Sequence, residues 1–99
     1  MDYQDYLTAI QTIAYEYIPN EQPLTREAAD QLGARLLGLT EPLNPLPKHT
    51  TRHQTVICYR EKGNWVPVTI HFQTTPEGTV RYARIHAPSF IKEYGEEQF

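Results

Sequence analysis

Residues 54–87 read QTVICYREKGNWVPVTIHFQTTPEGTVRYARIHA, three runs of β-branched and aromatic residues separated by two turn sequences. Such runs, bounded by Gly, Pro and Asn, are typical of β-strands joined as hairpins. Residues 61–64, Glu-Lys-Gly-Asn, fit a two-residue loop, and a loop of that length places Arg60 opposite Trp65. The stretch therefore predicts three antiparallel strands that pair in chain order.

The second turn sequence predicts how the second and third strands pair. Residues 75–78, Thr-Pro-Glu-Gly, place proline early and glycine late, as β-turns favour. With a loop of this length, His71 is predicted to pair with Tyr82, and Ile70 with Ala83.

The alternation of side chains along each strand divides the sheet into two faces. One face is almost wholly apolar and is predicted to form the core, through Ile57, Tyr59, Val66, Val68, Ile70, Phe72, Ala83, Ile85 and Ala87. The other face is basic and aromatic and is predicted to look outward, with Val56, Cys58, Arg60, Trp65, Pro67, Thr69, His71, Tyr82, Arg84 and His86. Both predictions depend on loop length, because a one-residue change moves a whole strand to the opposite face.

Pro67 interrupts the pattern of the middle strand, because proline has no N–H to donate to a neighbouring strand. We expect Pro67 beside a bulge or beyond the end of a neighbouring strand. A three-residue first loop would place the side chains of residues 54–60 on the opposite faces, and the sequence leaves this alternative open.

Two amphipathic segments precede the sheet. Residues 1–18 repeat apolar side chains at steps of three and four, which predicts a helix with Asp2 as its N-cap. Residues 25–37 form the second predicted helix, with Thr25 as N-cap and Gly38 as a left-handed C-terminal cap. Both helices are predicted to pack on the sheet, and a dimer seam along the first helix is the alternative.

Residues 24–33, LTREAADQLG, resemble the opening helix of the helix-turn-helix units in excisionase-type and MerR-type DNA-binding proteins. The resemblance implies that a polar recognition helix follows. Residues 34–39, ARLLGL, instead continue apolar and stop. The segment is therefore predicted to be an amphipathic helix that tolerates Gly33 in its interior.

Two further segments complete the predicted fold. Residues 41–51 hold three prolines and predict a loop between the helices and the sheet. Residues 88–95, PSFIKEYG, suit a short helical turn, with Pro88 at its first position and Gly95 at its end. The predicted fold is α+β: two N-terminal helices packed on one face of a three-stranded antiparallel β-meander, with a short C-terminal helical turn, in a single domain of residues 1–99.

The composition is that of a globular chain without a membrane span. The 99 residues are 39% hydrophobic, and no apolar run approaches the length that crosses a bilayer. The acidic N-terminus lacks the basic start and apolar centre of a secretory signal. Cys58 is the single cysteine and has no internal disulfide partner, which agrees with a reducing compartment. We therefore expect a soluble cytoplasmic protein with no membrane partner.

Charge is divided along the chain, within a net charge of −3. Residues 1–47 carry seven acidic and two basic side chains, a balance of −5, whereas residues 48–87 carry six basic and two acidic ones, a balance of +4. Residues 88–99 carry three acidic side chains and one basic one, a balance of −2. Acidic helices thus precede a basic sheet.

No combination of residues predicts catalysis or metal binding. His49 and His53 stand four apart in a proline-flanked segment, where that spacing does not place two rings on one side, and no Cys pair or carboxylate completes a zinc site. Cys58 and His71 share the outward face, but the predicted pairing sets Gln54 opposite His71, roughly 13 Å along the strand from Cys58. A thiolate is activated only within hydrogen-bond reach, so we expect no enzyme, no metal and no cofactor.

The outward face holds the residue types that dominate protein interfaces. Trp, Tyr and Arg contribute much of the binding energy there, whereas a solvated sheet face usually carries Thr, Lys and Glu. We therefore predict a protein-interaction module whose partner-binding residues are Arg60, Trp65, His71, Tyr82, Arg84 and His86. A nucleic-acid-binding face built from the same residues is the alternative, because aromatics stack on bases and arginines meet phosphates. A homodimer and a face that is only solvated also remain open.

Overall fold

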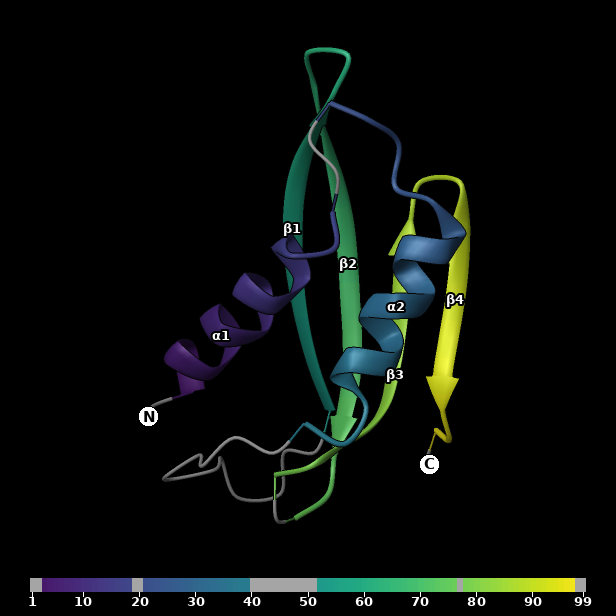
Figure 1. Cartoon of the computed structure of the whole chain (residues 1–99). Helices are drawn as coiled ribbons and strands as arrows, with labels where there is room; N and C mark the ends of the chain where they lie inside the picture. The colour runs from purple at the N-terminus through teal and green to yellow at the C-terminus, as the bar shows by residue number, and fades with distance from the viewer. Residues whose placement is uncertain (1–2, 19–20, 40–51, 77, 98–99) are drawn as a thin grey trace.

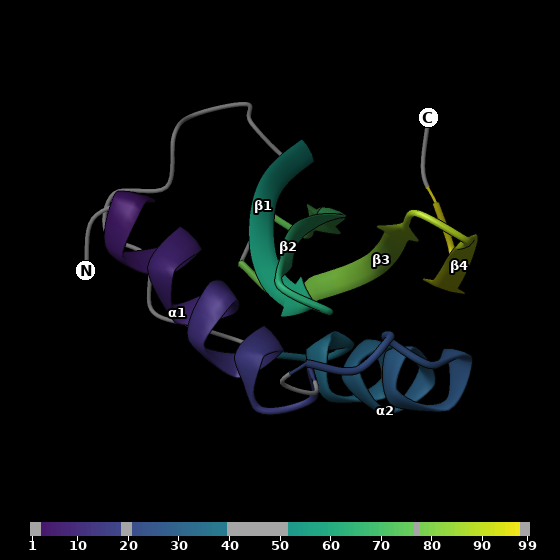
Figure 2. The ribbon, with the colours of Figure 1, turned by 90° about the horizontal axis from the view of Figure 1, so that it is seen from above.

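The computed structural model describes residues 3–18, 21–39, 52–76 and 78–97. Two helices precede four strands, in the order α1 (Tyr3–Tyr15), α2 (Arg26–Leu36), β1 (Arg52–Glu61), β2 (Asn64–Thr74), β3 (Val80–Ala87) and β4 (Phe90–Gly95) (Figure 1). The strands form one antiparallel sheet in chain order, and both helices lie on the same side of it (Figure 2). The α+β class is confirmed, whereas the three-stranded sheet and the C-terminal helical turn are wrong.

The first hairpin has the predicted two-residue loop. Lys62 and Gly63 both have positive φ, 52° and 80°, which is the geometry of a type I′ turn. This loop sets Arg60 opposite Trp65. The predicted register of β1 against β2 is therefore confirmed, and with it the two faces of β1.

The second hairpin loop is one residue longer than predicted. The Thr75 N–H donates to the Thr79 carbonyl at 2.8 Å, and the Gly78 N–H donates to the Thr75 carbonyl at 2.9 Å. A glycine at positive φ, here 92° at Gly78, suits hairpin loops of two residues and of three, so the turn composition did not fix the length. By itself, the extra residue would move every side chain of β3 to the opposite face of the sheet.

A β-bulge turns β3 back. The register shifts by one residue beyond Gln73, which leaves Arg81 as the extra residue of β3. The two one-residue changes cancel in side-chain direction but add in register. Each residue of β2 from Thr69 to Gln73 therefore faces a residue two places later than predicted. The predicted partners Tyr82 and Ala83 are therefore wrong. The corrected pairs are His71 with Arg84 and Ile70 with Ile85.

One apolar cluster joins the helices to the sheet, and the predicted core face together with Val80 supplies the sheet's share of it. The helices contribute Tyr6, Ile10, Ala14, Ala29, Leu32 and Leu36. The strands contribute Ile57, Tyr59, Val68, Ile70, Phe72, Val80, Ala83, Ile85 and Ala87, with Val66 packed at the margin. Each fully buried large aliphatic side chain stabilises the fold by roughly 1.5–3 kcal/mol, so this face alone accounts for the position of both helices.

Residues 90–95 form the fourth strand, not the predicted helical turn. Pro88 and Ser89 are a two-residue loop between the paired residues Ala87 and Phe90. Along β4 the side chains alternate between half-buried and exposed, the pattern of a strand that is covered on one face. The half-buried ones, Phe90, Lys92 and Tyr94, lie on the helix side of the sheet.

Helix α2 holds β4 in place. The Tyr94 ring lies against Gly33, where an added Cβ would overlap the ring, so this glycine is required rather than merely tolerated. The Tyr94 hydroxyl donates to Asp30 Oδ1 at 2.9 Å, and the Arg26 guanidinium lies 5.5 Å from the centre of the Phe90 ring. These contacts join positions far apart in the sequence, so no local pattern reveals them.

The first helix and the segment after it close the β1 edge of the sheet. The Tyr15 hydroxyl donates to the Cys58 carbonyl at 3.2 Å, and the Glu21 N–H donates to the Arg60 carbonyl at 2.9 Å. Because the Cys58 backbone turns toward Tyr15, its partner Pro67 needs no N–H toward β1. On its other side the pairing of β2 with β3 ends at residue 69, so Pro67 lies beyond the end of a neighbouring strand, as predicted.

The helix boundaries agree with the sequence in most respects. The Ala28 N–H donates to Thr25 Oγ1 at 3.1 Å, and Gly38 has a φ of 80°, as predicted for the two caps of α2. Helix α1 ends at Tyr15, three residues before the predicted end. The predicted cap Asp2 and the loop 41–51 lie outside the described residues. In the part of the chain that the structure describes, neither helix is long and apolar enough to cross a membrane.

Candidate partner-binding face

The side of the sheet opposite the helices is organised in five cross-strand rows, which we call the outer face. From the first hairpin to the far end, the rows are Arg60–Trp65, Cys58–Pro67, Val56–Thr69–His86–Ile91, Gln54–His71–Arg84–Glu93 and Arg52–Gln73–Tyr82–Gly95. Successive rows lie roughly 7 Å apart, because side chains on one face recur every two residues. Within residues 3–18 and 21–39, both helices pack on the other side, so neither covers this face (Figure 2).

The row at the first hairpin presents an indole to solvent. Trp65 is 65% exposed, and the Arg60 guanidinium lies over its ring at 5.1 Å from the ring centre. Arg60 also donates to the Gly63 carbonyl at 3.0 Å and lies 3.8 Å from a Glu21 carboxylate oxygen. The arginine therefore orients the indole and leaves the outward side of the ring available for contact.

The middle rows are more apolar than polar. Val56 at one end and Ile91 at the other are 45% and 55% exposed. Between them a shallow hollow of about 360 Å³ is lined by Pro67, Thr69, His86, Ala87 and Pro88. Val56 and Ile91 thus leave aliphatic side chains exposed on a sheet face that no described helix covers.

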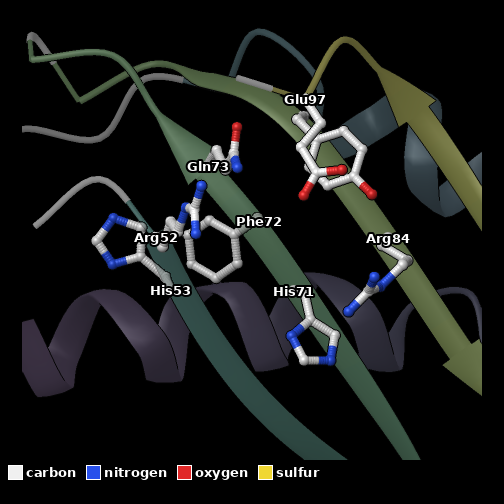
Figure 3. A pocket seen from close by; sticks show the side chains of 8 residues that line it. Arg52, His53, His71, Phe72, Gln73, Arg84 and Glu97 are labelled. Carbon is white, nitrogen blue, oxygen red and sulfur yellow. The ribbon is translucent and has the colours of Figure 1, made fainter. Parts of the chain in front are cut away.

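The two rows farthest from the first hairpin surround a second, more polar hollow of about 200 Å³, which we call the far hollow. Its lining includes Arg52, His71, Gln73, Tyr82, Arg84 and Glu97. Figure 3 shows Arg52 and Arg84 on the two sides of β2, with His71 and Gln73 between them. Glu97, which follows β4, completes the rim.

Tyr82 is on the outer face but is not available to a partner in the way the sequence predicted. Its side chain is only 4% exposed, and its hydroxyl donates to Glu93 Oε1 at 2.9 Å. Burial, that hydrogen bond and the charges of Glu93 and Glu97 raise the pKa of Tyr82 to about 12, although Arg84 opposes them. Together with burial, Glu93 on β4 and Glu97 after it cause this pKa shift. The helical turn predicted for residues 88–95 gives no reason to expect these carboxylates beside Tyr82.

His71 lies in a positive environment. Partial burial lowers the pKa of its ring below the usual value, and the nearby charges of Arg84 and His86 lower it further. Each cause favours the neutral ring. The far hollow therefore combines the His71 imidazole with the Arg84 guanidinium, whose charge disfavours protonation of the ring.

The residues considered for metal binding and catalysis are separated in the structure. His53 is on the core face, with its Nε2 2.9 Å from Thr74 Oγ1, and burial lowers its pKa. Its predicted companion His49 lies outside the described residues. The described ranges hold no group of three or more His, Cys, Asp or Glu side chains that could bind a metal ion. Cys58 is opposite Pro67, while Gln54 is opposite His71, as the register predicted.

The six predicted partner-binding residues fall into three places. Arg60 and Trp65 are together at the hairpin, His86 is in the middle, and the other three predicted residues, His71, Tyr82 and Arg84, line the far hollow.

The prediction missed Arg52, Gln73 and Glu97, which complete the far hollow. Arg52 and Gln73 were within reach of the sequence, because they continue the alternation of β1 and β2 by one further step. Glu97 was not, because its position depends on the fourth strand.

Comparison of the chain with protein-family models, with curated proteins and with solved structures finds no match.

Proposed function

We propose that this chain is a small binding module that docks a partner protein on the outer face of its sheet. The observation that carries the proposal is the 65% exposure of Trp65 on the side of the sheet opposite both helices. Tryptophan is the residue most enriched at the centre of protein interfaces, and leaving an indole in water forgoes a large part of its burial free energy. A partner surface would recover that free energy.

The rest of the outer face supports a protein rather than a polynucleotide as the partner. Stacking of bases needs several accessible aromatic rings along a cationic track. The Tyr82 ring is buried, and two carboxylates, Glu93 and Glu97, stand beside the far hollow. Exposed Val56 and Ile91 instead offer aliphatic contact area, which suits a protein surface.

We further propose that the protein acts in the cytoplasm. Cys58 is a free, exposed thiol in the middle of the outer face. An interface with such a thiol at its centre suits a reducing environment, where the thiol stays unmodified.

The test is partner capture by paired variants, with the captured protein identified by mass spectrometry and then measured as a purified partner by calorimetry. We expect Trp65→Ala to weaken binding at least tenfold, because truncation of an aromatic hot-spot residue costs about 2 kcal/mol or more. Asn64→Ala, at the adjacent position whose side chain points to the other face, is the matched control and should bind like the wild type. Equal affinity of the Trp65→Ala and wild-type chains, at equal thermal midpoints, would refute the proposal.

A further inference from the structure

The far hollow of the outer face has the form of a small anion site. Arg52 on β1 and Arg84 on β3 flank the central strand β2, which supplies His71 and Gln73 as the floor (Figure 3). The lining thus holds four donor-bearing side chains on three adjacent strands, and among them the Arg84 Nε is buried without a hydrogen bond within the described residues. Strands joined in one sheet hold such donors in fixed relative positions, which favours recognition of one defined group.

Arg84 has no ion-pair partner among the described residues of this lining. Its Nε is buried and donates no hydrogen bond within the described residues, and no described carboxylate lies within 4.0 Å of its guanidinium. Its cross-strand neighbour Glu93 accepts the hydrogen bond of the Tyr82 hydroxyl. Arg60, the other arginine on the predicted list, contrasts with it, because Arg60 has both a carboxylate and a carbonyl partner.

The size of the hollow decides what kind of ligand it takes. A volume of about 200 Å³ is below the 300–1,000 Å³ that is usual for drug-sized ligands and cofactors. It suits a single side-chain carboxylate, whose two oxygens match the fork of a guanidinium. The chain itself places a carboxylate there, because Glu97 is part of the rim.

We propose that the far hollow binds a Glu or Asp side chain of the partner, with Arg84 as the principal contact and Glu97 as an internal competitor for the same donors. The inference rests on the proposed function, because it names the chemistry that the outer face selects. It also assigns the two ends of the outer face different tasks: Trp65 supplies contact area, and Arg84 supplies the requirement for an acidic partner.

The experiment is an NMR titration of the full chain with a synthetic hexapeptide of alternating Glu and Ser, followed at the Arg84 side-chain Nε–H and the His71 ring. The control peptide has Gln in place of Glu. We expect saturable shifts with the Glu peptide and none with the Gln peptide. Glu97→Gln should tighten binding about threefold, because it removes a like charge from the rim.

Variants of the two arginines make the test specific. Arg84→Gln should weaken binding of the Glu peptide about tenfold or more, and Arg84→Lys should fall between, because the ammonium keeps the charge but lacks the fork. Arg60→Gln, on the same face but already paired with Glu21, should change the affinity less than about twofold.

Three results would overturn the inference. The first is the absence of saturable shifts in both the wild-type and Glu97→Gln chains. The second is equal weakening by Arg60→Gln and Arg84→Gln. The third is inorganic phosphate binding as tightly as the Glu peptide at matched ionic strength, which would assign the hollow to a free oxyanion. If the wild-type chain does not bind the Glu peptide but still captures its partner in a Trp65-dependent way, this inference is wrong and the proposed function is still supported.

Discussion

The two faces of this sheet are built from alternate residues of the same strands, yet they have opposite properties. On the core face, Ile70 and Phe72 are 0% and 2% exposed and belong to the apolar cluster that residues of both helices complete. On the outer face, Trp65 and Ile91 are more than half exposed, and ionised side chains surround a hollow. The comparison teaches that the core face determines the fold, whereas the outer face is free to determine binding. A substitution on one face need not change the contacts of the other face, because the two sets of side chains point to opposite sides of the sheet.

The largest expected difference between the faces comes from one substitution made on each. Ile70→Ala removes a side chain from the dry core and should lower the free energy of unfolding by about 2–5 kcal/mol. Ile91→Ala, the same change on the outer face, should lower it by less than about 0.5 kcal/mol. Urea unfolding of the two variants measures both values. Similar losses would show that the outer face is also part of the stabilising core.

A smaller effect tests how the core face holds its fourth strand. Gly33→Ala should destabilise the fold by about 1–3 kcal/mol through overlap with the Tyr94 ring, although alanine favours a helix by about 1 kcal/mol over glycine. Gly33→Ala combined with Tyr94→Leu should cost less than the sum of the single changes, because the leucine leaves room for the methyl group. Additive losses would contradict the close packing of α2 on β4.

The smallest expected effect is a pH dependence that involves a histidine from each face. Burial lowers the pKa of His53, and burial with the charges of Arg84 and His86 lowers that of His71, both from 6.5. A histidine with a lowered pKa in the folded chain binds its proton more readily when unfolded. The stability that its neutral form confers is therefore present above pH 6.5 and is lost as the pH falls.

Unfolding free energies between pH 7.5 and pH 5 measure this effect in the wild-type, His53→Gln and His71→Gln chains. Each substitution should flatten the decline, and His53→Gln should flatten it more, because His53 is the more buried of the two rings. An unchanged decline in both variants would contradict the assigned environments of these rings.

The faces of the sheet could be predicted from the sequence because their determinants are local. Alternation from Val66 through Phe72 leaves only one apolar side, and the Lys62-Gly63 loop fixes the register of the first hairpin. The faces of β3 were also predicted, but only because the longer loop and the bulge at Arg81 cancel. The register of β3 against β2 was therefore wrong by two residues.

The fourth strand and the far hollow could not be predicted, because they depend on contacts between distant segments. Phe90, Ile91 and Tyr94 are spaced as on a helix, and their strand conformation follows from a ring packed on Gly33. The burial of Tyr82 and the position of Glu97 depend in turn on that strand. The error in this one element therefore gave the wrong exposure for Tyr82 and left Glu97 out of the predicted site.

The most direct test of the outer face as the binding face is side-chain footprinting by hydroxyl radicals, with and without the captured partner. In the free chain, Trp65 and Ile91 should be modified rapidly and Phe72 slowly. With the partner bound, the account predicts protection of Trp65 and Ile91, while Tyr15, half exposed on α1, keeps its rate. Protection of Tyr15 with unchanged modification of Trp65 would contradict it.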